Sequence, residues 1–148
     1  MGRNLGKVGN IKLTRLAIVG SRDYPIMEAV YEYVSSLPPG TVVVSGGAVG
    51  VDKLAEDVAR SRGLKVISFK PNWRLYPYSR FKNYAYFARN QEIVDAADEI
   101  TAFWNLKSPG TRDTLRKALK AKKKINLYYV RDKEVVLAEV ESIEKWVT

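Results

Sequence analysis

The 148-residue chain contains no histidine and no cysteine, and these absences exclude several kinds of chemistry. Without cysteine there is no disulfide framework, no thiol nucleophile and no thiolate metal site. Without histidine there is no imidazole base, which excludes a Ser-His-Asp triad. Zinc sites almost always use one of these residues, so we predict no metal site, although carboxylates alone could hold a hard cation. Any proton transfer must use Asp, Glu, Tyr, Lys or water.

Long apolar runs are absent too, and none approaches the ~20 residues that a membrane-spanning helix needs. The first residues lead into a glycine-rich basic segment and not into the apolar core of a signal peptide. We therefore expect a cytoplasmic protein. The length suits one domain, and a sizeable core is available because 46% of the residues are apolar and 11% are aromatic.

Acidic residues are scarce, since 16 of them against 25 basic residues give a net charge of +9. The excess lies in three clusters, at residues 1–15, 71–90 and 111–124. One interpretation is a basic surface that meets polyanions, and the other, for the last cluster, is a solvated helix face. The candidates for contact with nucleic acid are Arg74, Arg80, Lys82, Arg112 and Arg116.

Short apolar runs rich in valine and isoleucine alternate with helical patterns. Strands are expected at 16–19, 41–44, 65–69, 99–104 and 124–130, and helices at 26–37, 51–62, 81–97 and 109–122. The alternation predicts an α/β, Rossmann-like domain of three layers, with a mainly parallel sheet of about five strands and helices on both faces. Residues 134–140 could add a C-terminal strand before a short helix. We expect a basic N-terminal arm at 1–14 and a single domain at 15–148.

Three glycine-containing loops, at 20–22, 45–52 and 108–111, follow strands at the edge where ligands bind in such sheets. Glycines let the backbone approach a ligand, and the free N–H groups at a helix start attract phosphate. The loop at 45–52 could equally be a tight turn, and the loop at 108–111 a helix cap. Two such loops beside one crevice favour an anion site, with Arg22 at its rim.

Seven aromatic residues lie between residues 73 and 87, with bases interleaved. This mixture suits stacking on nucleobases while the cations contact the backbone. The alternative is packing, with Tyr84 and Phe87 facing the core and Trp73 or Tyr76 at a contact between subunits. The apolar surface also leads us to expect a homo-oligomer.

Four motifs in this order resemble the SLOG superfamily, a Rossmann-like group that contains the DprA/Smf and the LOG ("lysine decarboxylase-like") proteins. The motifs occupy residues 18–22, 43–55, 88–94 and 108–111, and the likeness is greatest to the YspA/YpsA-related branch. The resemblance implies a sensor or carrier whose glycine loops bind a nucleotide or nucleotide-derived ligand, with no other cofactor. The ligand- or phosphate-binding candidates are Gly20, Ser21, Arg22, Ser45, Gly46, Gly47, Gly50, Asp52, Arg89, Asn90, Ser108, Gly110 and Thr111.

The DprA-like branch implies a different function, because its members bind single-stranded DNA through this fold. Their Ser-Gly-x-Ala-x-Gly-Ile-Asp pattern is close to residues 45–52, and an Arg-Asn segment matches Arg89 and Asn90. Single-stranded nucleic acid is therefore the alternative partner.

The LOG-like branch implies an enzyme, since its members hydrolyse the N-glycosidic bond of nucleoside monophosphates with the Glu of Pro-Gly-Gly-x-Gly-Thr-x-x-Glu. Here Thr114 stands at the Glu position, and Asp113 is one residue early, an offset that turns a side chain by about 100° on a helix. A hydrolase would have to use Asp113 or Asp52 with water. Asp52 could instead bond ligand hydroxyls or favour the dipole of its helix. No catalytic residue is assigned.

Overall fold

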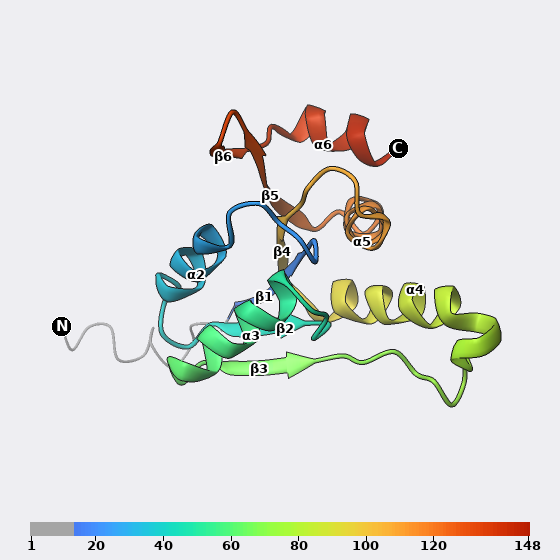
Figure 1. Ribbon diagram of the computed structural model, residues 1–148. Coiled ribbons are helices and arrows are strands. Elements are labelled where there is room, and N and C mark those ends of the chain that lie inside the picture. The colour runs from blue at the N-terminus through green and yellow to red at the C-terminus, as the bar shows by residue number, and fades with distance from the viewer. Residues whose placement is uncertain (1–13) are drawn as a thin grey trace.

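A six-stranded sheet with helices on both faces forms the molecule, and the computed structural model describes residues 14–148 (Figure 1). All of the expected arm except Thr14 lies outside the described residues. The strands are β1 (Arg15–Gly20), β2 (Val42–Ser45), β3 (Lys65–Ser68), β4 (Glu99–Phe103), β5 (Lys124–Arg131) and β6 (Glu134–Leu137). The helices are α2 (Met27–Ser35), α3 (Val51–Ser61), α4 (Tyr78–Ala96), α5 (Pro109–Lys120) and α6 (Val140–Val147). The predicted Rossmann-like fold class is confirmed.

The strand order is β3-β2-β1-β4-β5-β6. The direction in which successive strands are added to the sheet therefore reverses between β1 and β4. The chain builds outward from β1 to β3, crosses back, and continues on the other side of β1 with β4, which pairs parallel to it. The loops after β1 and β4 therefore diverge, one toward each side, and leave a crevice beyond the carboxyl ends of these strands.

The last strand is the exception to the parallel arrangement. β6 pairs antiparallel with β5 through a two-residue turn, in which Asp132 and Lys133 have φ of 52° and 65°. Positive φ at both central residues is the geometry that joins twisted strands in a tight hairpin. The strand ends at Leu137 and not at residue 140 as predicted, because α6 already begins at Val140.

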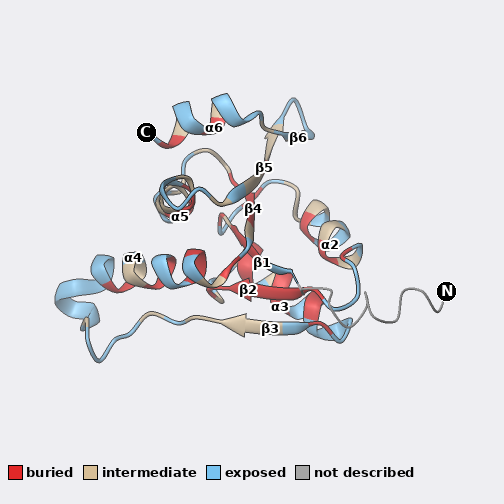
Figure 2. Ribbon diagram, turned by 180° about the vertical axis from the view of Figure 1, so that it is seen from behind, coloured by how far each residue is buried: buried red, intermediate tan, exposed pale blue. Residues whose placement is uncertain are grey.

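Two apolar clusters lie on the two faces of the sheet, because successive side chains of a strand point to opposite faces. Under α2 and α3, the buried side chains include Ile18, Val43 and Phe103. Under α4, α5 and α6, they include Trp104 and Leu127. Figure 2 shows buried residues concentrated in the central strands and on the helix faces that contact them.

The amino-terminal part of α4 and the loop before it extend beyond the sheet (Figures 1 and 2). The helix begins three residues earlier than predicted, and Phe81 (φ −127°, ψ 29°) interrupts its first turns. Tyr84 and Phe87 are 63% and 42% exposed, so the interpretation that places them in the core is wrong. None of the helices in residues 14–148 combines the length and the hydrophobicity that a membrane span requires.

A core substitution tests the packing of β5 against the helices. Leu127 is fully buried, so Leu127→Ala should lower the free energy of unfolding by about 2–5 kcal/mol. Leu75→Ala is the matched control, because Leu75 is 64% exposed, and it should change stability by less than about 0.5 kcal/mol. Urea denaturation followed by tryptophan fluorescence measures both, and equal effects would contradict the described packing.

Candidate ligand-binding site

A pocket of about 350 Å³ opens where the strand order reverses, between the loops that follow β1, β2 and β4. Eight of the thirteen predicted ligand residues line it: Gly20, Arg22, Asp52, Arg89, Asn90, Ser108, Gly110 and Thr111. Five further residues line the pocket but were not among the predicted ligand residues: Val19, Ala48, Ile93, Pro109 and Thr114. The remaining five candidates, Ser21, Ser45, Gly46, Gly47 and Gly50, are not among the lining residues.

Two of these other candidates, Gly46 and Gly50, lie behind the lining residues and allow close packing there. Gly46 lies so close to Arg89 that a Cβ there would come within 2.7 Å of Nη1. Gly50 has φ of 99°, and a Cβ would overlap the backbone of Arg22, so this position requires glycine. The glycines of the β2–α3 loop therefore bring the backbone and Arg89 together, and they do not themselves face the pocket.

Arg89, on α4, is the buried cation of the pocket, at 9% exposure. Its Nη1 donates to the carbonyl of Gly46 at 2.8 Å, and its Nε donates to Oδ1 of Asn90 at 3.1 Å. Burial lowers the pKa of Arg89, and the nearby carboxylate of Asp52 opposes that effect. Its Nη2 has no hydrogen-bond partner among residues 14–148, so this guanidinium has donors left for a ligand.

Among residues 14–148, Asp52 is the one acidic residue that lines the pocket, and it is 6% exposed. Burial raises its pKa to about 7, whereas the charge of Arg89 and the backbone N–H groups of Ala48 and Gly20 act in the opposite direction. The carboxyl group therefore lies against one N–H of the β2–α3 loop and one N–H at the end of β1. Once it is ionised, above about pH 7, this side chain places an anion of the protein itself at the start of α3.

The start of α3 is consequently a poor place for an external phosphate. This differs from the sequence-based expectation that the glycine loop at 45–52 attracts one. The N–H of Val51 donates to Ser21 O, and that of Lys53 donates to Ala48 O, at 3.4 and 3.0 Å. With Asp52 beside them, most donors of this helix start are already used.

The start of α5 is different, because its donors are free. Ser108 is the N-cap residue, but its side chain makes no capping hydrogen bond. Within residues 14–148, the backbone N–H groups of Gly110 and Thr111 have no partner, and both residues line the pocket. Unpaired N–H groups at a helix start carry partial positive charge, which favours an anion.

Ser21 and Asn105 hold the loops after β1 and β4 against each other. Oγ of Ser21 accepts from the N–H of Asn105 at 2.9 Å and lies 3.1 Å from Oγ of Ser108. Oδ1 of Asn105 accepts from the N–H groups of Lys107 and Ser108, while its Nδ2 donates to Asp23. Sequence reasoning missed Asn105, although an asparagine just before a Ser-Pro helix start is a common turn signal.

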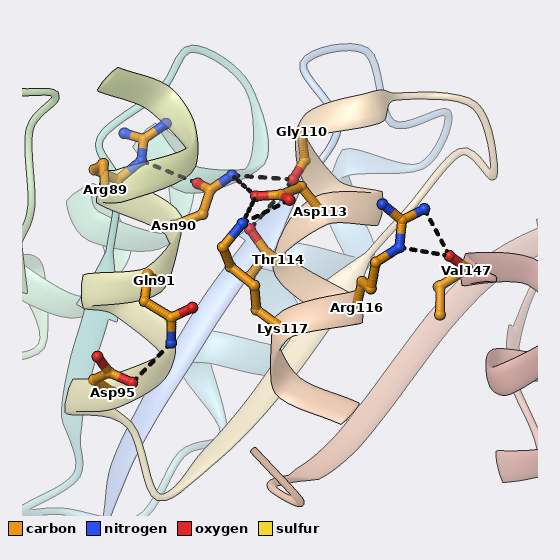
Figure 3. A network of polar contacts seen from close by, with 10 residues as sticks. All are labelled: Arg89, Asn90, Gln91, Asp95, Gly110, Asp113, Thr114, Arg116, Lys117 and Val147. Carbon is orange, nitrogen blue, oxygen red and sulfur yellow. Dashed lines mark hydrogen bonds and ion pairs between the residues drawn. The ribbon is translucent and has the colours of Figure 1, made fainter. Parts of the chain in front are cut away.

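A polar network continues from the pocket into α5 (Figure 3). Nδ2 of Asn90 donates to the carbonyl of Gly110 at 3.4 Å and to Oδ2 of Asp113 at 3.0 Å. Lys117 forms an ion pair with the same carboxylate at 2.6 Å. Asp113 is thus engaged in bracing α4 against α5, and Thr114, at the position of the LOG glutamate, donates to the carbonyl of Gly110.

The predicted nucleic-acid candidates fall into two groups. Arg74, Arg80 and Lys82 lie on the segment that extends beyond the sheet, among the exposed aromatic residues Trp73, Tyr78, Phe81, Tyr84 and Phe87. We call residues 73–87 the aromatic–basic segment. On α5, Arg112 lies over the ring of Trp104, whereas Arg116 donates twice to the carbonyl of Val147 and so holds the end of α6.

Comparison with known proteins identifies relatives of this arrangement. The family model for the "YspA, cpYpsA-related SLOG family" matches residues 14–76. The Gene 61 protein of Mycobacterium phage D29 is 32% identical over 114 residues, which are 74% of this chain and 91% of the phage protein.

Two solved structures share the fold. DNA processing protein A (DprA) of Streptococcus pneumoniae has a TM-score of 0.68 at 18% identity, over 92% of this chain and 55% of that protein. DNA processing protein A of Helicobacter pylori has a TM-score of 0.66 at 25% identity. That structure was described for the way in which the Helicobacter protein binds single-stranded DNA. That match covers 87% of this chain and 71% of the Helicobacter protein. The chain thus spans only 55% of the length of the first of these structures.

The raised pKa of Asp52 predicts a particular dependence of stability on pH. Between the ordinary value of 3.8 and about 7, the folded protein keeps a proton that the unfolded chain releases. The contribution of this group is therefore full at acidic pH and is lost as the pH rises to about 7. Asp52→Asn stays neutral throughout, so the stability of the wild type relative to this variant should fall over that range. Urea midpoints from pH 4 to 8 measure it, and a constant difference would contradict the assignment.

Proposed function

The chain belongs to the YspA, cpYpsA-related SLOG family, as its motifs predicted, and we propose that it binds the phosphate of a nucleotide at the start of α5. One observation carries the proposal. The free N–H groups of Gly110 and Thr111 and the free Nη2 of Arg89 belong to residues that line the same pocket. Donors on two helices around one pocket suit an oxyanion.

The rest of the pocket suits the other parts of a nucleotide. Its volume of about 350 Å³ lies within the range of small-molecule sites. Val19 and Ile93 supply apolar surface, and the carboxylate of Asp52 can accept hydrogen bonds from sugar hydroxyls. Arg22 is exposed at the rim, where it adds a second cation for the phosphate.

We favour binding over hydrolysis of the ligand. The glutamate of the LOG pattern is replaced by Thr114, and Asp113 forms an ion pair with Lys117 and accepts a hydrogen bond from Asn90. Asp52 is the one remaining carboxylate among the described residues that line the pocket, and these residues provide no second carboxylate of the kind that glycosidases pair with their acid.

Binding of nucleoside 5′-monophosphates, followed by isothermal titration calorimetry, tests the phosphate site. The monophosphates should bind, and the matching nucleosides should bind at least tenfold more weakly. Arg22→Ala removes an exposed pocket cation and should weaken monophosphate binding by about tenfold. Arg131→Ala is the control, because it removes the same charge from the exposed end of β5.

Position 110 provides a second matched pair of variants. A Cβ at Gly110 meets nothing within 4 Å, so Gly110→Ala keeps the N–H and should bind as the wild type does. Gly110→Pro deletes this N–H in the first helical turn, where proline is tolerated, and should weaken binding. Equal affinity of monophosphate and nucleoside, or no effect of Arg22→Ala and Gly110→Pro, would refute the proposal.

Single-stranded nucleic acid is the second candidate ligand, and the aromatic–basic segment favours it. Arg80 lies over Phe81 and Lys82 over Tyr78, each 5.5 Å from the ring centroid. Exposed rings among cations are the surface that stacks on bases and follows a phosphate backbone. The similarity to the Helicobacter protein, which binds single-stranded DNA, agrees with this candidate.

Fluorescence anisotropy with labelled oligothymidylate distinguishes the two ligands. A strand that uses both sites should bind with an affinity that falls steeply with salt, because counterions are released. Tyr84→Ala should weaken strand binding about fivefold or more and leave monophosphate binding unchanged. Tyr31→Ala, on α2 and similarly exposed at 56% against 63%, is the control. Absence of strand binding would leave the free nucleotide as the ligand.

A further inference from the structure

The outer edge of β6 offers unpaired backbone groups to a partner. β6 is the last strand of the sheet, and no other described strand pairs with its outer side. The N–H of Ala138 donates to Leu127 O, which shows that the backbone N–H and C=O of Ala138 point toward β5. Val136, two residues earlier in the strand, points its backbone groups the same way. Val135 and Leu137 therefore point theirs outward, because these directions alternate along a strand.

The side chains of this edge are apolar and exposed. Val135 is 36% exposed, Leu137 is 55% exposed, and Val140 just beyond the strand is 58% exposed. Natural edge strands are often protected by charged residues, proline or a bulge. Residues 134–137 contain no proline and pair one to one with β5, and their one charged residue is Glu134, beside the hairpin turn. Figures 1 and 2 show β6 at the periphery of the molecule, next to α6.

We infer that the occupant of this edge is a second copy of the chain, whose β6 pairs antiparallel with it about a two-fold axis at Val136. Only residues that point outward can exchange hydrogen bonds, so Val135 must face Val135, Leu137 or Glu139 of the other copy. Pairing of Val135 with Leu137 is the register that matches apolar side chains with each other.

The same register also matches charge. It places Lys133 of each copy opposite Glu139 of the other, and both residues are exposed. A shift by one pair in either direction would set Leu137 against Lys133 or Val135 against Glu139. Opposite charges and apolar pairs across strands each stabilise the pairing, so the edge is complementary to itself in this register.

The dimer joins two six-stranded sheets into one continuous sheet, with the two pockets at opposite ends of the strands because the copies are antiparallel. Four backbone hydrogen bonds and a small apolar patch form the core of the contact, which is characteristic of a weak dimer. The inference is independent of the proposed ligand, since β6 lines no part of that pocket.

Cysteine cross-linking tests the register, and the chain has no native cysteine to interfere. In this dimer, Val136 faces its own symmetry mate as a non-hydrogen-bonded pair, with Cα atoms ~4.5 Å apart. That separation permits a disulfide, so Val136→Cys should form covalent dimers rapidly under mild oxidation. Val135→Cys and Leu137→Cys would each lie roughly 8 Å from their symmetry mates and should cross-link at least tenfold more slowly. Tyr31→Cys, on exposed α2, gives the rate of random collision.

Sedimentation velocity over a range of concentrations provides an independent test. The wild type should shift toward twice the mass of the chain as concentration rises, and Leu137→Asp should remain monomeric with unchanged circular dichroism. Leu75→Asp, which places the same charge at another exposed leucine, should dimerise normally. A monomeric wild type, dimers that persist in Leu137→Asp, or Val136→Cys that reacts no faster than Tyr31→Cys would overturn the inference. Faster cross-linking at position 135 or 137 than at 136 would overturn it as well.

Discussion

The buried guanidinium of Arg89 is the interaction on which the carboxyl edge of the sheet depends. It joins the glycine loop after β2, through the carbonyl of Gly46, to Asn90 on its own helix. Asn90 in turn contacts Gly110 and Asp113 on α5, so two halves of the sheet are connected across the point where strand order reverses. A buried cation is costly unless it is compensated, and Asp52 and the carbonyl groups supply that compensation.

The distribution of charge around Arg89 explains why one helix start and not the other is suited to a ligand. Asp52 lies against the N–H groups of Ala48 and Gly20 and, once ionised, acts as an internal anion at α3. At α5 there is no such carboxylate, because Asp113 is one residue past the first turn and is bound by Lys117. The positive end of α5 therefore faces the pocket without a counter-ion from the described residues.

The alternation of apolar runs and helical patterns was sufficient to predict the α/β fold, since buried parallel strands leave a clear signal in Val43, Ile100 and their neighbours. It did not predict the start of α4, where aromatic residues with helical spacing turn out to be exposed beyond the sheet. Eight of the thirteen predicted ligand residues line the pocket. The division of roles among the glycines could not be read from the sequence. A glycine that lines a ligand pocket and a glycine that packs against Arg89 occur in the same kind of local sequence. Only the packing of α4 against the loop determines which role each glycine has.

NMR shifts of the backbone amides, the indole N–H groups and the arginine side chains during titration with a nucleoside 5′-monophosphate locate the bound phosphate. If the phosphate binds at the start of α5, the largest shifts should occur at Gly110 and Thr111, followed by Arg22 and the side chain of Arg89. The indole N–H of Trp104, which donates to the carbonyl of Ser108, should shift with them. Saturating shifts confined to the glycine loop at 46–50, or to a surface away from the start of α5, would contradict phosphate binding at α5.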